Sequence, residues 1–230
     1  MTIIVYELVG GDASRPFSPH CWKTLMSLAH KGLEYRREAV PFTDVPKVES
    51  GAGKTVPIIR DGERVVVDSF DIALYLDEAY PDRPSLFRGE GGKSMARFIE
   101  AWAATQINAV IIGHIVQEIH QMLSPEDQTY FRHSREARFG MSLEDCRQAT
   151  QERFDSLKSR LDPLRFMLNR QPFIGGESPL FCDYIVFGAF QWSRICSPVK
   201  MLDPDDPVHD WFESLLDLYD GLGRSVPAAA

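Results

Sequence analysis

The first 80 residues alternate strand-like and helix-like runs in an order that few folds accommodate. A β-branched run at 2–8 precedes helical spacing over 18–32, and a second strand-like run follows at 33–40. A strand, a helix and a strand within about 40 residues are typical of a βαβ unit with parallel strands. Short runs on either side of Asp61-Gly62 predict a hairpin, and helical spacing over 70–80 predicts a helix after it. We therefore expect a small mixed sheet covered by helices.

The rest of the chain predicts only helices. Helical patterns occupy the stretches 94–122, 142–169, 181–195 and 207–218. Pro163 is expected to kink or divide the helix in which it lies. We predict an α/β plus all-α protein, with an N-terminal domain over residues 1–84 and an all-helical domain over residues 92–230.

Composition and charge exclude several classes of binding partner. Of 230 residues, 44% are hydrophobic, the net charge is -8, and the basic residues are scattered, so we expect a sizeable core and no nucleic-acid or membrane partner. No secretory signal and no apolar segment approaching bilayer length is expected. Four separated cysteines indicate reduced thiols and a cytoplasmic location. No metal site is expected, because the spacing of six between His114 and His120 does not put both imidazoles on one helix face.

The segment Phe17-Ser18-Pro19 places a hydroxyl at the start of the first predicted helix. Serine is preferred at an N-cap and proline at the first helical position. Ser18 can satisfy free backbone N–H groups, or it can face an anion that the helix N-terminus already favours. Cys21, in the first turns of the same helix, is a possible nucleophile, and a buried inert thiol is the alternative.

Two later junctions combine loops with polar residues. Val56-Pro57 opens a strand at a bond where a cis peptide can occur, and Asp68-Ser69 precedes the next helix, with Ser69 as its expected N-cap. The run 51–55 ends in Gly-Lys-Thr like a phosphate-binding loop. Val48 stands where that motif requires glycine, and Val56-Pro57 favours an extended chain where the motif requires a helix, so nucleotide binding is not expected.

These three junctions, in this order, resemble the glutathione transferase family. More narrowly, the stretches 18–32, 68–84 and 210–224 are similar to serine-type bacterial β-etherases, which cleave lignin β-aryl ethers, and to related fungal transferases. The resemblance implies a thioredoxin-like N-terminal domain that binds glutathione as co-substrate, a cis Val56-Pro57 bond and an all-helical domain that binds a second substrate. It also implies a homodimer.

The resemblance assigns roles to individual residues. Ser18 matches the catalytic serine, the Val56 backbone pairs with the cysteinyl part of glutathione, and Lys54 is a candidate for its glycyl carboxylate. Asp68 and Ser69 hold the γ-glutamyl end. In the family's core helix a Ser/Thr-x-x-Asp capping box is common.

Here Asp183 is in register with that capping box, but the cap position holds Leu180, and Ser178 is the expected substitute. Aromatic or histidine side chains from the helix around Trp102 to His120 are expected in the wall of the second-substrate pocket, and Trp192 is a further candidate. Packing in the core is the alternative explanation for each of these residues.

Three readings of function follow. The first is a glutathione transferase that attacks a hydrophobic aromatic substrate, with β-aryl ether cleavage as one form. The second is a protein of the same fold that binds glutathione or aromatic ligands with little catalysis. The third is a thiol transferase that uses Cys21, as cysteine-type relatives do, although the matching position holds Ser18.

Overall fold

The computed structural model describes residues 2–230 and contains one four-stranded sheet in the order β2-β1-β3-β4. The strands are β1 (Ile3–Leu8), β2 (Tyr35–Val40), β3 (Ile58–Asp61) and β4 (Arg64–Val67). β1 runs parallel to β2 and antiparallel to β3, and β3 and β4 form a hairpin at Gly62, whose φ is 59°. The predicted βαβ unit and hairpin are confirmed.

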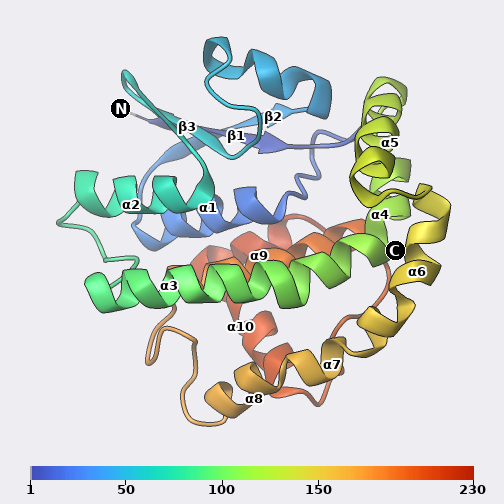
Figure 1. Ribbon diagram of the computed structural model, residues 1–230. Coiled ribbons are helices and arrows are strands. Elements are labelled where there is room, and N and C mark those ends of the chain that lie inside the picture. Colours follow the sequence, from blue (N-terminus) through green and yellow to red (C-terminus); the bar gives the residue numbers. More distant parts are fainter. Residues whose placement is uncertain (1) are drawn as a thin grey trace.

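The helices of the N-terminal domain lie on both sides of this sheet. α1 (Pro19–His30) and α2 (Ser69–Ala79) lie between the sheet and the helical domain, and the 3-10 helix η1 (Phe42–Ser50) lies on the other side (Figure 1). Gly32 adopts a φ of 61° just after α1, as expected at the end of a helix. The stretch 43–55, which has no regular pattern in the sequence, therefore contains a short helix.

The second domain is entirely helical, and the predicted fold class is confirmed. Its elements are α3 (Glu90–Ala103), the π-helical segment η2 (Ala104–Asn108), α4 (Ala109–Met122), α5 (Pro125–Phe139), α6 (Leu143–Asp155), α7 (Leu157–Arg160), α8 (Asp162–Leu168), α9 (Phe181–Cys196), α10 (Pro207–Gly221) and the 3-10 helix η3 (Leu222–Ser225). The predicted helix over 142–169 is divided into α6, α7 and α8. Pro163 lies in the first turn of α8, where its missing N–H removes no helical hydrogen bond.

The run from α3 to α4 corrects one expectation. Residues 90–122 form one helical run of 33 residues that, by length and composition alone, could cross a membrane. Half of its most apolar window is buried inside the protein, where Ile107, Ile111 and Ile115 are inaccessible to solvent. The expectation that no segment approaches that length is wrong, and the buried side chains explain the apolar composition as that of a core helix.

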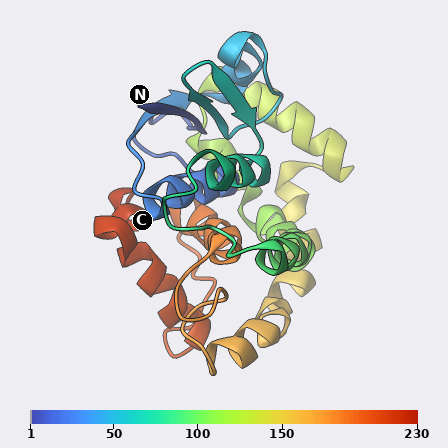
Figure 2. The same cartoon turned by 90° about the vertical axis from the view of Figure 1, so that its left-hand side faces the viewer.

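α9 is the central helix of the molecule and fixes the position of α1. Every residue of α9 except Arg194 is buried, and the helix packs against α1 and α3 (Figure 2). A Cβ added at Gly188 would lie 2.3 Å from the carbonyl oxygen of Pro19. Glycine at this position therefore lets α9 touch the first turn of α1, next to Ser18.

The start of α9 departs from the expected cap. Leu180 offers no side-chain cap, and Ser178 does not replace it, because its hydroxyl accepts a hydrogen bond from Arg88. The buried Asp183 carboxylate instead accepts from the N–H of Leu180 at 2.9 Å. It also accepts from the N–H groups of Ile174 and Gly175 and from the Trp211 indole, so one carboxylate holds a loop and two helices.

Candidate functional site

Ser18 is the N-cap of α1, as predicted. Its Oγ accepts a hydrogen bond from the N–H of Cys21 at 3.4 Å, and its side chain is largely buried. Two contacts fix the loop before it: Phe17 N–H donates to the carbonyl of Leu8, and the Trp22 indole donates to the carbonyl of Pro16. A hydroxyl has one proton and two lone pairs, so accepting from Cys21 leaves the proton of Ser18 available.

Ser18 lines a cavity of about 470 Å³ between the two domains. The walls come from the loop before α1, η1, the segment 54–56, and helices α3, α4, α5 and α9. Lys54 and Val56 also line it, so the fold brings together three of the five residues predicted for the site. Asp68 and Ser69 are not among the lining residues.

The segment 54–56 presents free groups to the cavity. Lys54 is exposed and makes no ion pair with another residue of the 2–230 range. Val56 is buried, and its backbone makes no hydrogen bond to another backbone group in the described chain. The Val56–Pro57 peptide bond is cis, which confirms that expectation.

The junction before α2 differs in detail from the prediction. Asp68, not Ser69, is the N-cap, and its carboxylate accepts from the N–H groups of Phe70 and Asp71. Asp68 has a φ of 77°, which is unusual for a residue with a side chain and typical of functional loops. The buried hydroxyl of Ser69 has no hydrogen-bond partner within residues 2–230.

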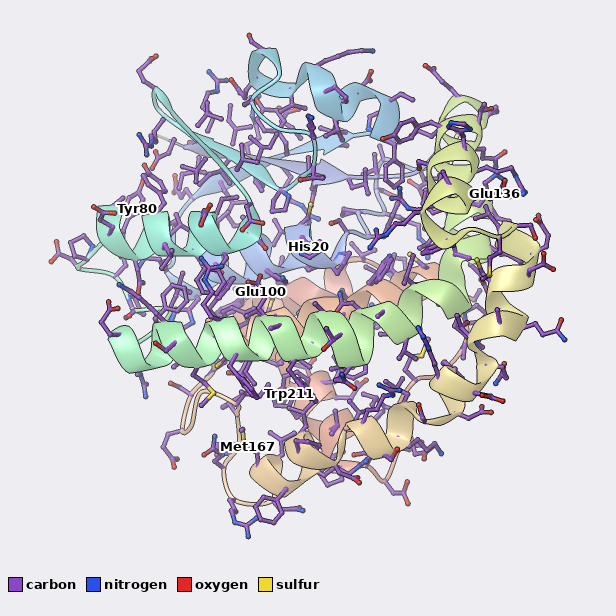
Figure 3. The ribbon with its side chains drawn as sticks, in the orientation of Figure 1. His20, Tyr80, Glu100, Glu136, Met167 and Trp211 are labelled. Atoms are coloured by element: carbon purple, nitrogen blue, oxygen red, sulfur yellow. The ribbon has the colours of Figure 1, made fainter. Side chains whose placement is uncertain are left out.

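Charged groups cluster between α1 and α3. The buried Lys23 ammonium lies 3.4 Å from the carboxylate of Glu100, and burial lowers its pKa while Glu100 and Asp68 raise it. His20 is exposed in the cleft but crowded by protein atoms, and this crowding and Lys23 lower its pKa against the opposing effect of Asp68. Figure 3 shows His20 on α1 and Glu100 on α3, the helices that face each other beside the cavity.

Cys21 lies on the side of α1 that faces away from the cavity. Its thiol is fully buried and does not line the cavity. Burial raises the pKa of Cys21 to about 12, against the small lowering effect of the Ser18 hydroxyl. Since the thiolate is the nucleophile, this environment favours the inert thiol over the thiol-exchange reading.

The aromatic wall of the cavity comes in part from elements that the sequence did not indicate, η1 and α5. The helix around Trp102 to His120 lines the cavity with small, amide and aliphatic side chains, such as Ala103, Asn108 and Ile112, so the expectation of aromatic or histidine side chains from it is wrong. Trp192 does line the cavity, as expected. The remaining aromatic side chains come from the loop and η1 of the first domain and from α5: Phe17, Phe42, Tyr130 and Phe131.

The two histidines of α4 pack against aromatic rings. His114 stacks on Phe154 with ring centroids 3.7 Å apart, and His120 lies against Phe131. Within the described part of the chain no three His, Cys, Asp or Glu residues are grouped so that they could hold a metal ion.

Sequence reasoning also missed α5 as a source of site residues. Arg135 and Arg138 on this helix line the cavity. A signal was present, because Ser124-Pro125 repeats the cap and first-turn proline of Ser18-Pro19. The helix was not predicted because it has no apolar stripe: only Asp127 and Phe131 of its fifteen residues are buried.

Comparison with known families identifies the chain. The family description "Glutathione S-transferase, C-terminal domain" matches residues 94–212, and "Glutathione S-transferase, N-terminal domain" matches residues 17–79. The chain belongs to the glutathione S-transferase family. This family supplies the thioredoxin-like domain and the helical domain observed in the structure.

Curated relatives match different shares of the chain. The glutathione S-transferase-like protein ustS of Aspergillus flavus is 27% identical over 211 residues, which cover 79% of this chain and 75% of that protein. Glutathione S-transferase Z1 of Arabidopsis thaliana is 41% identical over 68 residues, or 27% of this chain and 31% of that protein.

Solved structures agree with the fold. Glutathione transferase GSTFuA3 from Phanerochaete chrysosporium matches with a TM-score of 0.77 and 26% identity, over 100% of this chain and 99% of its own. A glutathione S-transferase of Ceriporiopsis subvermispora, solved in complex with glutathione, matches over 100% of both chains with a TM-score of 0.80 and 22% identity, a level that shows the fold alone.

Proposed function

We propose that this glutathione S-transferase family member is a catalyst that activates glutathione through Ser18. The observation that carries the proposal is the Ser18 hydroxyl at the cavity wall, which accepts from the Cys21 N–H and keeps its own proton for a ligand. The hydroxyl donates a hydrogen bond to the sulfur of bound glutathione and so favours the thiolate, whose proton is released to solvent. The positive end of the α1 dipole favours negative charge at the same place.

The energies are sufficient for this role. A thiol with a pKa of about 8.5 is only a few per cent thiolate at neutral pH. Lowering that pKa by about two units needs about 2.7 kcal/mol of preferential stabilisation of the thiolate. One hydrogen bond to a charged group contributes about 1.5–3 kcal/mol, and a helix N-terminus about 0.3–2 kcal/mol. Ser18 and α1 together therefore reach the required amount.

The rest of glutathione lies along the free groups beside Ser18. The Val56 backbone, which bonds to no other backbone group in residues 2–230, pairs with the cysteinyl unit, and Lys54 faces the glycyl carboxylate. Asp68 and Ser69 hold the γ-glutamyl end, and the Ser69 hydroxyl, which has no hydrogen-bond partner within residues 2–230, is available to it. The glutathione complex of the Ceriporiopsis relative supports this choice of co-substrate.

The second substrate is a hydrophobic aromatic electrophile. The aromatic and aliphatic side chains around the cavity support this class. In a β-aryl ether, the glutathione thiolate forms a C–S bond at the ether carbon while the C–O bond breaks, and the aryl oxide leaves with the bonding pair and takes up a proton. In an aryl halide, the same attack releases halide.

The test is turnover with glutathione. Purified protein is incubated with glutathione and a panel of α-keto β-aryl ethers, aryl halides, quinones and epoxides, and products are identified by mass spectrometry. A glutathione adduct, or a phenol released only with glutathione, supports the proposal. Tight binding of glutathione by calorimetry without any turnover would instead favour the ligand-binding reading.

We also propose that the protein is a homodimer. Phe98 and Met95 on α3 expose 65% and 46% of their surfaces, and a second copy would cover such apolar side chains. Light scattering during gel filtration should give twice the chain mass of 26.1 kDa.

A further inference from the structure

The arginines of helix α5 differ in whether a carboxylate neutralises them. Arg132 lies 2.8 Å from the carboxylates of both Glu136 and Glu144. Arg135 and Arg138 line the cavity and have no carboxylate within 4.0 Å in residues 2–230. The two arginines that face the cavity are thus the ones left without a counter-ion.

The surroundings of Arg135 are aromatic and cationic. Its guanidinium lies 4.7 Å from the ring centroid of Phe131 and 5.6 Å from that of Phe42, and it donates one hydrogen bond, to the hydroxyl of Ser134. Burial and the nearby Arg138 lower the pKa of Arg135, and Tyr130 opposes this slightly. A bound anion would offset both the cost of burying this charge and its repulsion from Arg138.

The cavity as a whole carries excess positive charge although the protein has a net charge of -8. Of the described residues that line it, Glu100 alone is acidic, and Glu100 already meets Lys23 and Arg97. Lys54 is assigned to glutathione by the proposed function. Arg135 and Arg138 therefore remain for another ligand.

A row of aromatic rings connects the two ends of the cavity. Phe17, next to Ser18, lies 6.3 Å from Phe42 between ring centroids, and Phe42 lies 5.4 Å from Phe131. Arg135 follows Phe131 by one helical turn and covers its ring. A planar substrate lying along this row has one end at the serine and the other at the arginines.

We propose that the second substrate is an aromatic electrophile with a carboxylate, which Arg135 binds with the help of Arg138 while the reacting carbon lies at Ser18. The position of the reacting carbon rests on the proposed function, but binding of the carboxylate does not. Arginine suits this task because its N–H groups match both carboxylate oxygens.

Binding is tested with an unreactive pair that differs only in charge, 3,5-dinitrobenzoate and 3,5-dinitrobenzamide, by calorimetry at saturating glutathione. The wild-type protein is expected to prefer the carboxylate at least about tenfold. Arg135→Gln should remove most of that preference, and Arg135→Lys should restore part of it. The amide corrects for lost packing against the two phenylalanines, because both ligands share that loss.

Turnover is tested with 4-chloro-3,5-dinitrobenzoate and its amide, where the thiolate forms the C–S bond and chloride leaves with the electron pair of the C–Cl bond. The carboxylate-to-amide ratio of kcat/KM should fall about tenfold in Arg135→Gln. Arg153→Gln is the matched control, since Arg153 is an exposed arginine of α6 outside the cavity. It removes the same charge and should leave the ratio unchanged.

Two results would overturn the inference. One is an equal carboxylate preference in wild type and Arg135→Gln. The other is a rise in the KM for glutathione in Arg135→Gln, which would assign Arg135 to the glycyl carboxylate. Carboxylate-selective binding without turnover of either chloride, or of any compound in the panel of electrophiles above, would reject the proposed function and leave this inference standing.

Discussion

Replacing Ser18 by alanine tests both uses of its hydroxyl in one variant. The substitution removes the hydrogen bond that the hydroxyl accepts from Cys21. It also removes the hydrogen bond that the hydroxyl is proposed to donate to glutathione. Loss of an N-cap costs about 1 kcal/mol of stability, which lowers Tm by about 2–4 °C in a chain of this size. Loss of a hydrogen bond to a thiolate costs about 1.5–3 kcal/mol of thiolate stabilisation, which raises the pKa of bound glutathione by about 1–2 units.

The expected loss of activity depends on pH with a definite sign. The thiolate is present above the thiol pKa, so raising that pKa removes thiolate at low pH and leaves it intact at high pH. Below the wild-type pKa, Ser18→Ala should therefore reduce kcat/KM by about 10- to 100-fold, and the deficit should shrink as the pH passes the new pKa. Thiolate absorbance of the bound glutathione, titrated over the same pH range, measures the shift directly.

Ser142→Ala separates the two effects. Ser142 caps α6 by accepting from the N–H of Asp145 at 3.1 Å, and it does not line the cavity. It should lower Tm by a similar amount and leave the pH profile unchanged. If Ser18→Ala gives a pH profile of kcat/KM that superimposes on that of the wild type, Ser18 does not stabilise the thiolate and the mechanism is wrong.

Three further substitutions test separate parts of the structure. Lys54→Gln should raise the KM for glutathione about fivefold with kcat nearly unchanged in initial-rate kinetics, and an unchanged KM would remove Lys54 from the glutathione site. Cys21→Ser should keep the rate of glutathione transfer within about twofold. In the native protein Cys21 should resist alkylation, because burial raises the pKa of its thiol to about 12. Loss of activity in Cys21→Ser would favour the thiol-exchange mechanism. Asp183→Ala leaves four N–H donors, three of them buried, without their acceptor. It should destabilise the protein by about 3–5 kcal/mol in urea unfolding, and a midpoint shift near zero would contradict this.

Local signals in the sequence predicted the parts of the fold that depend on neighbouring residues. Ser18-Pro19 starts α1, Gly32 follows its end, and Asp61-Gly62 turns the hairpin, because each requires only a cap or a particular backbone conformation. The same reasoning failed at Ser69, where the preceding aspartate took the cap position. Aspartate and serine are equally good caps, so sequence preference alone could not decide between them.

The substrate end of the cavity depends on contacts between distant residues, and the sequence could not supply these. Helix α5 buries few side chains and so lacks the apolar stripe by which helices are predicted. Phe42 reaches the cavity because its N–H donates to the carboxylate of Asp127, 85 positions later in the chain. No periodicity links such a pair, so the aromatic row and the arginines beyond it become visible only in the folded structure.

This long-range contact makes the aromatic wall common to both domains. The buried carboxylate of Asp127 accepts from the N–H groups of Phe42 and Thr43 at 2.9 Å each, and its own N–H donates to the cap of α5, Ser124. Its negative charge in the first turn also stabilises α5. The site proposed to stabilise the thiolate is therefore fixed within the first domain and by α9, while the Asp127 carboxylate ties the aromatic wall of the cavity to both domains. Under the proposed function, substitutions on α5 and η1 should therefore change substrate preference and leave the pKa of bound glutathione unchanged.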